Sequence, residues 1–296
     1  MDARRVADKL GIPFFALDLQ SDFSRIVDYF VDEYTHGRTP NPCVQCNNWI
    51  KFGGLFDYAD SVDAEFVATG HYAQIVERDG QAALLRGVDP GKDQSYALAG
   101  IDRRALSRML LPVGKFLKPD IRQLAGQAGL RVANKRDSQE ICFVTSGHHG
   151  EFVRARSGAI TAGNFVLQSG QVVGNHAGIE AFTIGQRKGL GIALGEPHFV
   201  LRIDPETFDV VLGPKEALER PSLLATDANW LVSPPALPFD GLAQIRYNSQ
   251  AVAARITPLD DRNFSVEFTE PASGIAPGQL CVVYDRDRVL GGGWIC

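Results

Sequence analysis

The sequence predicts an α/β domain with a parallel sheet over residues 1–147, followed by two small β domains over residues 148–221 and 222–296. Two patterns carry this prediction. Helix-spaced and strand-like apolar segments alternate in the first part, which is typical of a parallel sheet covered by helices. Short strands separated by glycine-rich turns dominate the remainder. The length of 296 residues suits two or three domains.

The first part contains two predicted helices, two predicted strands and a hairpin. Apolar residues at helical spacing predict one helix that stops at Gly11 and another that covers residues 23–34. Apolar runs predict a buried strand over residues 13–19 and a second strand over residues 66–69. Asp79-Gly80 predicts the turn of a following hairpin.

The second part consists of predicted strands at a regular spacing. Four of them, over residues 164–167, 171–174, 198–203 and 209–212, belong to the central domain. Four others belong to the last domain, over residues 243–247, 252–256, 264–268 and 280–284. Strands of this length and spacing predict a small barrel or sandwich.

Composition and charge exclude a membrane protein. No apolar run approaches the roughly 20 residues needed to span a bilayer, and the N-terminal residues resemble neither a secretory signal nor a transit peptide. The net charge is -5, but residues 101–136 hold nine Lys/Arg against two Asp, which is +7 locally and leaves -12 elsewhere. Such a stretch suits either phosphate binding or a solvated helical surface, and charge alone favours the surface.

Five cysteines, an odd number, indicate free thiols in a reducing compartment, and therefore a cytoplasmic protein. Cys43 and Cys46 form a Cys-x-x-Cys pair in a stiff loop with two prolines. Cys142 is the other candidate partner, whereas Cys281 lies in an apolar run and Cys296 is terminal. The spacing leaves open a structural metal site and thiol chemistry or a metal cluster, and favours the second.

Polar residues near expected turns form further candidate sites. His71 follows the second strand, at the sheet edge where ligands of parallel sheets gather, although an isolated histidine is often structural. Lys92 and Gln94 suit phosphate and base contacts beside an ordinary helix cap. Arg187-Lys188 lies among glycines and suits a phosphate backbone or a plain charged turn. Arg246-Tyr247 would be able to clamp an unpaired nucleotide.

Taken together, these segments resemble the tRNA-specific 2-thiouridylases (the MnmA/TrmU family). The resemblance rests on six segments in the expected order: Gly-Arg-Thr-Pro-Asn-Pro-Cys-Val-Gln-Cys-Asn, Ala-Thr-Gly-His-Tyr, Lys-Asp-Gln-Ser-Tyr, Asp-Ser-Gln-Glu-Ile-Cys-Phe, Thr-Ile-Gly-Gln-Arg-Lys-Gly-Leu-Gly-Ile and Ala-Pro-Gly-Gln. It runs from residue 2 to the C-terminus. Any one segment is weak, but the series is specific.

The resemblance implies a fold and an activity. The first domain would be PP-loop ATPase-like (adenine nucleotide alpha hydrolase-like), and the last a β-barrel. The family uses ATP, with Mg²⁺, to activate the C2 oxygen of the wobble uridine of tRNA, and replaces it with sulfur carried as a cysteine persulfide. The implied partners are tRNA and a persulfide sulfur donor, either a cysteine desulfurase or a relay protein, with no membrane involved.

The resemblance also implies residue roles. Cys46 is the expected nucleophile and Cys142 the expected persulfide carrier, and the two would form a disulfide when turnover ends. Gly70 would touch ATP. The others would contact tRNA, the first three of them at the target base: Asn41, Pro42, Cys43, His71, Lys92, Asp93, Gln94, Arg246, Tyr247 and Gln279.

Two features depart from the family pattern. Many members have Asp where this chain has Cys43, and Cys43, Cys46 and Cys142 make a three-thiolate set suited to an iron–sulfur cluster with one open iron. The family also has a Ser-Gly-Gly-x-Asp-Ser loop that cradles ATP, which this sequence lacks. We therefore expect a first domain that is incomplete at its N-terminus and binds ATP poorly. A non-catalytic tRNA-binding remnant and a zinc-stabilised module are the alternative functions.

Overall fold

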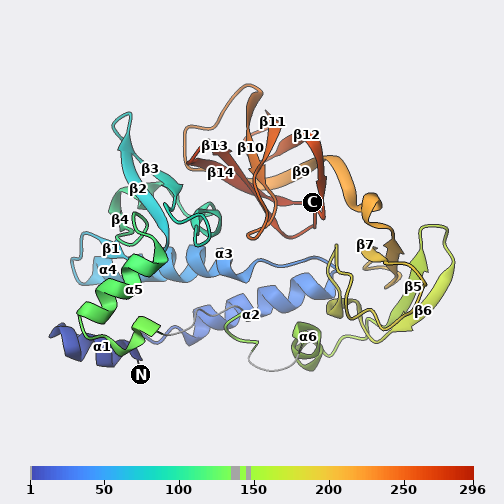
Figure 1. Cartoon of the computed structure of the whole chain (residues 1–296), viewed down its shortest axis with the longest axis horizontal. Helices are drawn as coiled ribbons and strands as arrows, with labels where there is room; N and C mark the ends of the chain where they lie inside the picture. Colours follow the sequence, from blue (N-terminus) through green and yellow to red (C-terminus); the bar gives the residue numbers. More distant parts are fainter. Residues whose placement is uncertain (1, 135–140, 145–147) are drawn as a thin grey trace.

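The structure is a computed structural model that describes residues 2–134, 141–144 and 148–296 (Figure 1). Helices form a layer along one side of an elongated molecule. A β-hairpin and a six-stranded barrel sit side by side on this layer, and a four-stranded sheet lies at the end farthest from the N-terminus. No helix within the described ranges is both long and apolar enough to cross a membrane.

The first domain is mainly helical around a small parallel sheet. Its helices are α1 (Asp2–Leu10), α2 (Gln20–Thr35), α3 (Pro42–Cys46), the π-helix η1 (Asn47–Gly54), α4 (Leu55–Ser61), η2 (Ser95–Leu98), η3 (Arg103–Arg108), α5 (Lys118–Gln127) and η4 (Arg131–Asn134). Strands β1 (Val67–Ala68) and β4 (Met109–Leu110) pair in parallel. The two predicted helices and the parallel sheet are therefore confirmed.

The predicted buried strand over residues 13–19 is wrong. These residues adopt no regular structure, and Phe15 is 70% exposed. Among the described residues, no strand lies beside this segment to pair with its backbone. An apolar run without a hydrogen-bonding neighbour cannot form a sheet, so hydrophobicity alone misled the assignment.

The predicted hairpin is confirmed and links the first domain to the last. Strands β2 (Ala73–Arg78) and β3 (Gln81–Arg86) are joined through Asp79 and Gly80, whose φ values of 56° and 71° fit a tight two-residue turn. Leu85 of β3 pairs with Arg288 of the barrel, so the hairpin extends the barrel sheet.

The central domain has one helix and one small sheet. It consists of α6 (His149–Ser157), β5 (Gly163–Leu167), β6 (Val172–His176), the short helix η5 (Ile179–Ala181), β7 (Phe199–Ile203) and β8 (Val210–Gly213). The strands lie in the order β6-β5-β8-β7. The four predicted strands are confirmed as β5, β6, β8 and β7. Their apolar residues form the buried core of this sheet.

The last domain is a closed barrel. After η6 (Lys215–Leu218) come β9 (Glu219–Trp230), β10 (Phe239–Gln244), β11 (Val252–Pro258), β12 (Phe264–Ser273), β13 (Leu280–Asp285) and β14 (Arg288–Ile295). The order is β13-β10-β11-β12-β9-β14, and pairing of β13 with β14 closes the ring. The expected barrel is confirmed. The predicted strand over residues 243–247 instead ends at Gln244, which leaves Arg246 and Tyr247 in a turn.

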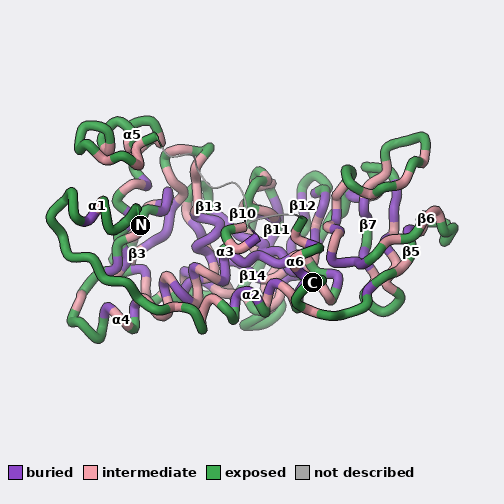
Figure 2. Tube along the Cα trace, turned by 90° about the horizontal axis from the view of Figure 1, so that it is seen from below, coloured by how far each residue is buried: buried purple, intermediate pink, exposed green. Residues whose placement is uncertain are grey.

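One core joins the first and last domains. Buried residues gather in the barrel and beneath it, whereas α1 and α5 are mostly exposed (Figure 2). Tyr96 of η2 is 1% exposed and packs in one cluster with Leu84 of the hairpin and Tyr284 of the barrel. Its hydroxyl donates to the Leu280 carbonyl at 2.7 Å. This shared core fixes the barrel relative to the helices, and so fixes any site between them.

Candidate functional site

Asn41 and Pro42 begin the short helix that carries two of the candidate thiols. The Asn41 Oδ1 accepts a hydrogen bond from the Val44 amide at 3.4 Å, and Pro42 occupies the first turn, where no backbone donor is needed. Cys43 and Cys46 are three residues apart on α3, so their side chains lie on neighbouring parts of one helical face. Cys43 is exposed and Cys46 is half-buried.

The barrel holds the loop that precedes this helix. The Gln279 Nε2 donates to the carbonyls of Thr39 and Pro40 at 3.1 and 3.0 Å, and the Gln279 residue is 9% exposed. The Tyr29 hydroxyl accepts from the Asn41 amide at 3.2 Å. Gln279, which the resemblance assigns to tRNA, therefore positions the loop in this structure.

Cys142 reaches the same place from a distant part of the chain. It is exposed and belongs to the described segment 141–144, whose Phe143 packs edge-on against Phe23 and Phe30 of α2 at 5.7 and 5.1 Å between ring centroids. This aromatic anchor fixes Cys142 over the helix layer. The fold thus brings Cys142 near the Cys-x-x-Cys pair, as its electrostatic effect on both other thiols indicates.

Electrostatics shows that the three thiols form one group. Burial is the main cause that raises the pKa of Cys43, and negative charge on Cys142 and Cys46 raises it further. Burial also raises the pKa of Cys46, with Cys142 adding to the effect and Lys51 opposing it. Negative charge on a neighbouring thiol therefore makes the Cys43 and Cys46 thiolates harder to form, and the Lys51 cation favours their reactive ionised form.

Lys51 is the functional candidate that the sequence reasoning missed. It lies on the π-helix η1, and its Nζ is 3.4 Å from the Nε2 of His71. His71 is 7% exposed, and its Nδ1 is 2.7 Å from the Thr69 hydroxyl. Burial, followed by the Lys51 charge, lowers the pKa of His71 to about 4. A π-helical stretch directly after the Cys-x-x-Cys pair was not readable from residue spacing.

His71 is expected to stay neutral from pH 8 down to pH 5. Its folded-state pKa of about 4 lies below the ordinary 6.5, so its contribution to stability is fully present above pH 6.5 and is lost as the pH falls towards 4. NMR of the imidazole should show no titration above pH 5. Between pH 6.5 and pH 4, the free energy of unfolding of the wild type should fall by up to about 1.4 kcal/mol per pH unit because of His71. In urea unfolding, His71→Gln should lack this part of the pH dependence. A titration midpoint near 6.5 would contradict the lysine contact.

Gly70 leaves open space at the carboxyl side of the parallel sheet. It lies two residues after β1 and is exposed, and a Cβ atom there would meet no other atom within 4 Å. A ligand is therefore able to approach the backbone closely. This is the expected place for a nucleotide, and the contact with ATP stays a prediction.

The Lys92-Asp93-Gln94 segment is tied into the protein at two of its three positions. The Asp93 carboxylate accepts from the amides of Gly87 and Ser95 at 2.9 and 3.0 Å, and from the Ser95 hydroxyl at 2.9 Å. It also pairs with Arg86 at 2.9 Å. The Gln94 Oε1 accepts from the Tyr72 amide at 3.0 Å. The structure therefore gives Asp93 and Gln94 positioning roles, and tRNA contact by this segment stays a prediction.

Arg246 and Tyr247 bring the barrel to the thiols. Tyr247 is 44% exposed, and its ring is 6.2 Å from that of Tyr96. Burial is the main cause that raises the Tyr247 pKa; Asp93 and Cys43 add to it, so Tyr247 lies near the Cys43 thiol. Arg246 donates to the Ile184 carbonyl at 2.8 Å, and its Nε has no hydrogen-bond partner among the described residues. Tyr247 thus places an exposed ring near Cys43, whereas Arg246 ties the barrel to the central domain.

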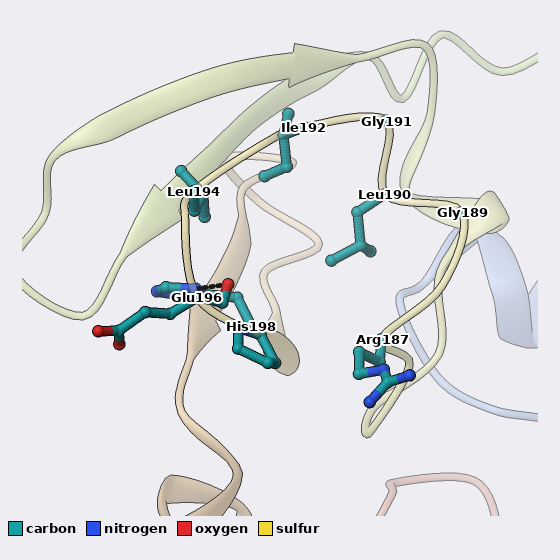
Figure 3. Close-up of a pocket in the computed structure, with 9 residues that line it drawn as sticks. Arg187, Gly189, Leu190, Gly191, Ile192, Leu194, Glu196 and His198 are labelled. Atoms are coloured by element: carbon teal, nitrogen blue, oxygen red, sulfur yellow. Dashed lines mark hydrogen bonds between the residues drawn. The ribbon is translucent and has the colours of Figure 1, made fainter.

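A separate cavity of about 410 Å³ lies in the central domain. Figure 3 shows that Leu190 points into the space enclosed by a glycine-rich loop, with Arg187 at one end and Glu196 and His198 at the other. None of its lining residues belongs to the thiol group. The Arg187-Lys188 motif is exposed beside this cavity, and its expected phosphate contact stays a prediction.

Among the described residues, no three or more His, Cys, Asp or Glu side chains are placed to hold a metal ion. Cys43, Cys46 and Cys142 are near one another, but they do not form a ready-made ligand set.

Three family models match the chain. The first, described as a tRNA methyl transferase HUP domain, matches residues 1–146. The second, a tRNA methyl transferase PRC-barrel domain, matches residues 150–214, and the third, an aminomethyltransferase beta-barrel domain, matches residues 220–295. These descriptions agree with a parallel-sheet domain followed by two β domains.

Relatives match almost the whole chain. A tRNA-specific 2-thiouridylase MnmA from Rhodopirellula baltica is 59% identical over 99% of this chain and 75% of its own length. Proteins of the same name from Geobacter metallireducens and Clostridium perfringens are 47% and 46% identical, again over 99% of this chain, and the match covers 81% and 83% of those relatives. At this identity and coverage, the chain belongs to the family of tRNA-specific 2-thiouridylases.

Proposed function

We propose that this chain is a sulfurtransferase that 2-thiolates the wobble uridine of tRNA, using ATP and a persulfide on Cys142. The observation that carries the proposal is that Cys142 lies near Cys46 and Cys43, with the exposed Tyr247 near Cys43. Family membership supports the same reaction. A protein persulfide donor would load Cys142, whose exposure leaves its sulfur accessible.

Different residues of the chain would have separate roles in the reaction. ATP with Mg²⁺ supplies the activation of the C2 oxygen of uridine, and the open backbone at Gly70 supports its approach. The outer sulfur of the Cys142 persulfide forms a bond to C2 as the activated oxygen leaves. The Cys46 thiolate then attacks the inner sulfur, which breaks the S–S bond, leaves sulfur on the base and forms a Cys46–Cys142 disulfide. A thiol reductant restores the two cysteines.

Binding of tRNA would use the surface around these thiols. Tyr247 offers an exposed ring on which a splayed base can stack, and Arg246, whose Nε has no partner among the described residues, offers a cation. Asn41 and Pro42 shape the loop at the target base, and Cys43 is exposed beside it. Lys92, near Tyr247, supplies positive charge for the phosphate backbone.

An iron–sulfur cluster on Cys43, Cys46 and Cys142 is the alternative to the relay. The described residues show no ready-made metal site, so no step is assigned to a cluster. Anaerobic reconstitution with iron and sulfide distinguishes the two. The relay predicts a flat visible spectrum and no bound iron, whereas stoichiometric iron with visible absorption would replace it with the cluster.

The test of the function is direct. Incubation with unmodified tRNA, ATP, Mg²⁺ and a persulfide donor should produce 2-thiouridine, measured by mass spectrometry of the digested nucleosides. Omission of ATP should abolish the product. Salt-sensitive tRNA binding without any 2-thiouridine would instead identify a non-catalytic tRNA-binding protein.

A further inference from the structure

We propose that Lys51, held by His71, forms an anion subsite beside Cys43 and Cys46 that takes a phosphate-class group. Its use during sulfur transfer rests on the proposed function, because the activated C2 oxygen would then carry such a group. The subsite itself rests only on the contacts of these residues.

The π-helix brings Lys51 to the thiols. Lys51 follows Cys46 by five residues, and η1 begins at Asn47, directly after Cys46. In an α-helix, residues five apart point in different directions, whereas i→i+5 hydrogen bonds place them on nearly the same face. The Leu55 amide donates to the Ile50 carbonyl in this pattern. A Cβ at Gly53 would lie 2.8 Å from the Asn48 carbonyl oxygen, so the glycine permits the wider turn.

His71 holds the ammonium without neutralising it. With a pKa of about 4 the ring is uncharged near neutral pH, so its Nε2 is able to accept a hydrogen bond from Lys51 while Nδ1–H donates to the Thr69 hydroxyl. Phe52 packs against the ring at 5.8 Å between centroids and fixes its orientation. A neutral acceptor fixes the Lys51 position but leaves its full positive charge.

None of the described carboxylates balances that charge. Across the described ranges, no Asp or Glu lies within ion-pair distance of Lys51, and the acidic groups that sense its charge are the thiols of Cys43 and Cys46. Lys51 is half-buried, so its charge is only partly solvated. A partly desolvated ammonium favours an anionic ligand, and one placed next to the nucleophile would act where negative charge develops.

Alkylation of Cys46 with two reagents of different charge tests the subsite. Iodoacetate is an anion and iodoacetamide is neutral, and both react with the same thiolate. A change in the thiolate fraction alters both rates equally. The ratio of the two rates therefore reports only the local electrostatic potential. Tandem mass spectrometry of the peptide separates Cys46 from Cys43. The assay needs neither tRNA nor ATP, so its failure is distinct from failure of the proposed function.

Lys51→Met should lower the iodoacetate-to-iodoacetamide ratio at Cys46 about fivefold or more, which is the effect expected from one nearby charge. Lys51→Arg should keep the ratio within about twofold because the charge remains. Lys115→Met removes an equal charge from an exposed position and serves as the matched control, with the ratio unchanged. An unchanged ratio in Lys51→Met, or an equal fall in Lys115→Met, would overturn the proposal.

A measurement on the wild-type protein tests the subsite even if the Lys51→Met variant misfolds. Inorganic phosphate, compared with chloride at equal ionic strength, should lower the ratio at Cys46 because it occupies the subsite. The same addition should not change the ratio in Lys51→Met. No effect of phosphate on the wild-type ratio would refute the subsite, whatever the stability of the variants.

Discussion

Cys46→Ser and Cys142→Ser are each expected to reduce 2-thiouridine formation by at least about 10³-fold while leaving tRNA affinity within a few-fold of wild type. The effect is large because serine can neither carry a persulfide nor cleave one, so no slower version of the relay remains. Serine keeps the size of each side chain, and burial raises the pKa of the Cys46 thiol, so the substitutions should remove little charge or surface from tRNA binding.

The two variants should fail at different stages. Cys142→Ser should accept no persulfide from the donor, whereas Cys46→Ser should load sulfur on Cys142 and then stall. Mass spectrometry of the intact protein, with and without reductant, separates these outcomes. Cys296→Ser is the matched control, because Cys296 is also an exposed free thiol but lies at the end of the barrel. Full activity in Cys46→Ser or Cys142→Ser would refute the relay.

The sequence predicted the fold class and the order of its parts, because helix and strand signals are local patterns. Short apolar runs predicted four of the six barrel strands but not β9 or β14, and Asp79-Gly80 predicted the hairpin turn. Position 15 shows the limit of this reasoning: an apolar segment is a strand only where another strand pairs with it, and that is a property of the fold.

The chemistry around the thiols was less predictable. The sequence analysis did not single out Lys51, because residue spacing does not reveal a switch from α-helix to π-helix. Gln279 was assigned to tRNA by resemblance, whereas its amide holds the Thr39 and Pro40 carbonyls from 240 and 239 residues away in the chain. Contacts of this kind exist only after the barrel docks on the helices, so a linear motif cannot separate a ligand contact from a positioning contact.

Asp93→Ala is expected to lower the free energy of unfolding by about 3–5 kcal/mol, because it removes the partner of a partly buried arginine. Arg86 lies over the Tyr284 ring at 3.7 Å and donates to Gln244 of the barrel at 3.1 Å, so it cannot turn to water without breaking the contact between hairpin and barrel. Urea unfolding measures the loss. Asp93→Asn should lose less, because the amide oxygen is still able to accept from Ser95.

Lys92→Met separates this structural role from tRNA binding at the neighbouring position. Lys92 is half-buried and lies near Tyr247, so removal of its charge should weaken tRNA binding and reduce the salt dependence by about one ion while stability changes little. Asp93→Ala, measured where it is still folded, should bind tRNA nearly as wild type does. If Asp93→Ala kept its stability and lost tRNA affinity instead, the carboxylate would be a ligand contact. The Arg86 pair would then be incidental to the fold, and the hairpin would dock on the barrel through the shared core of Tyr96 and Tyr284 alone.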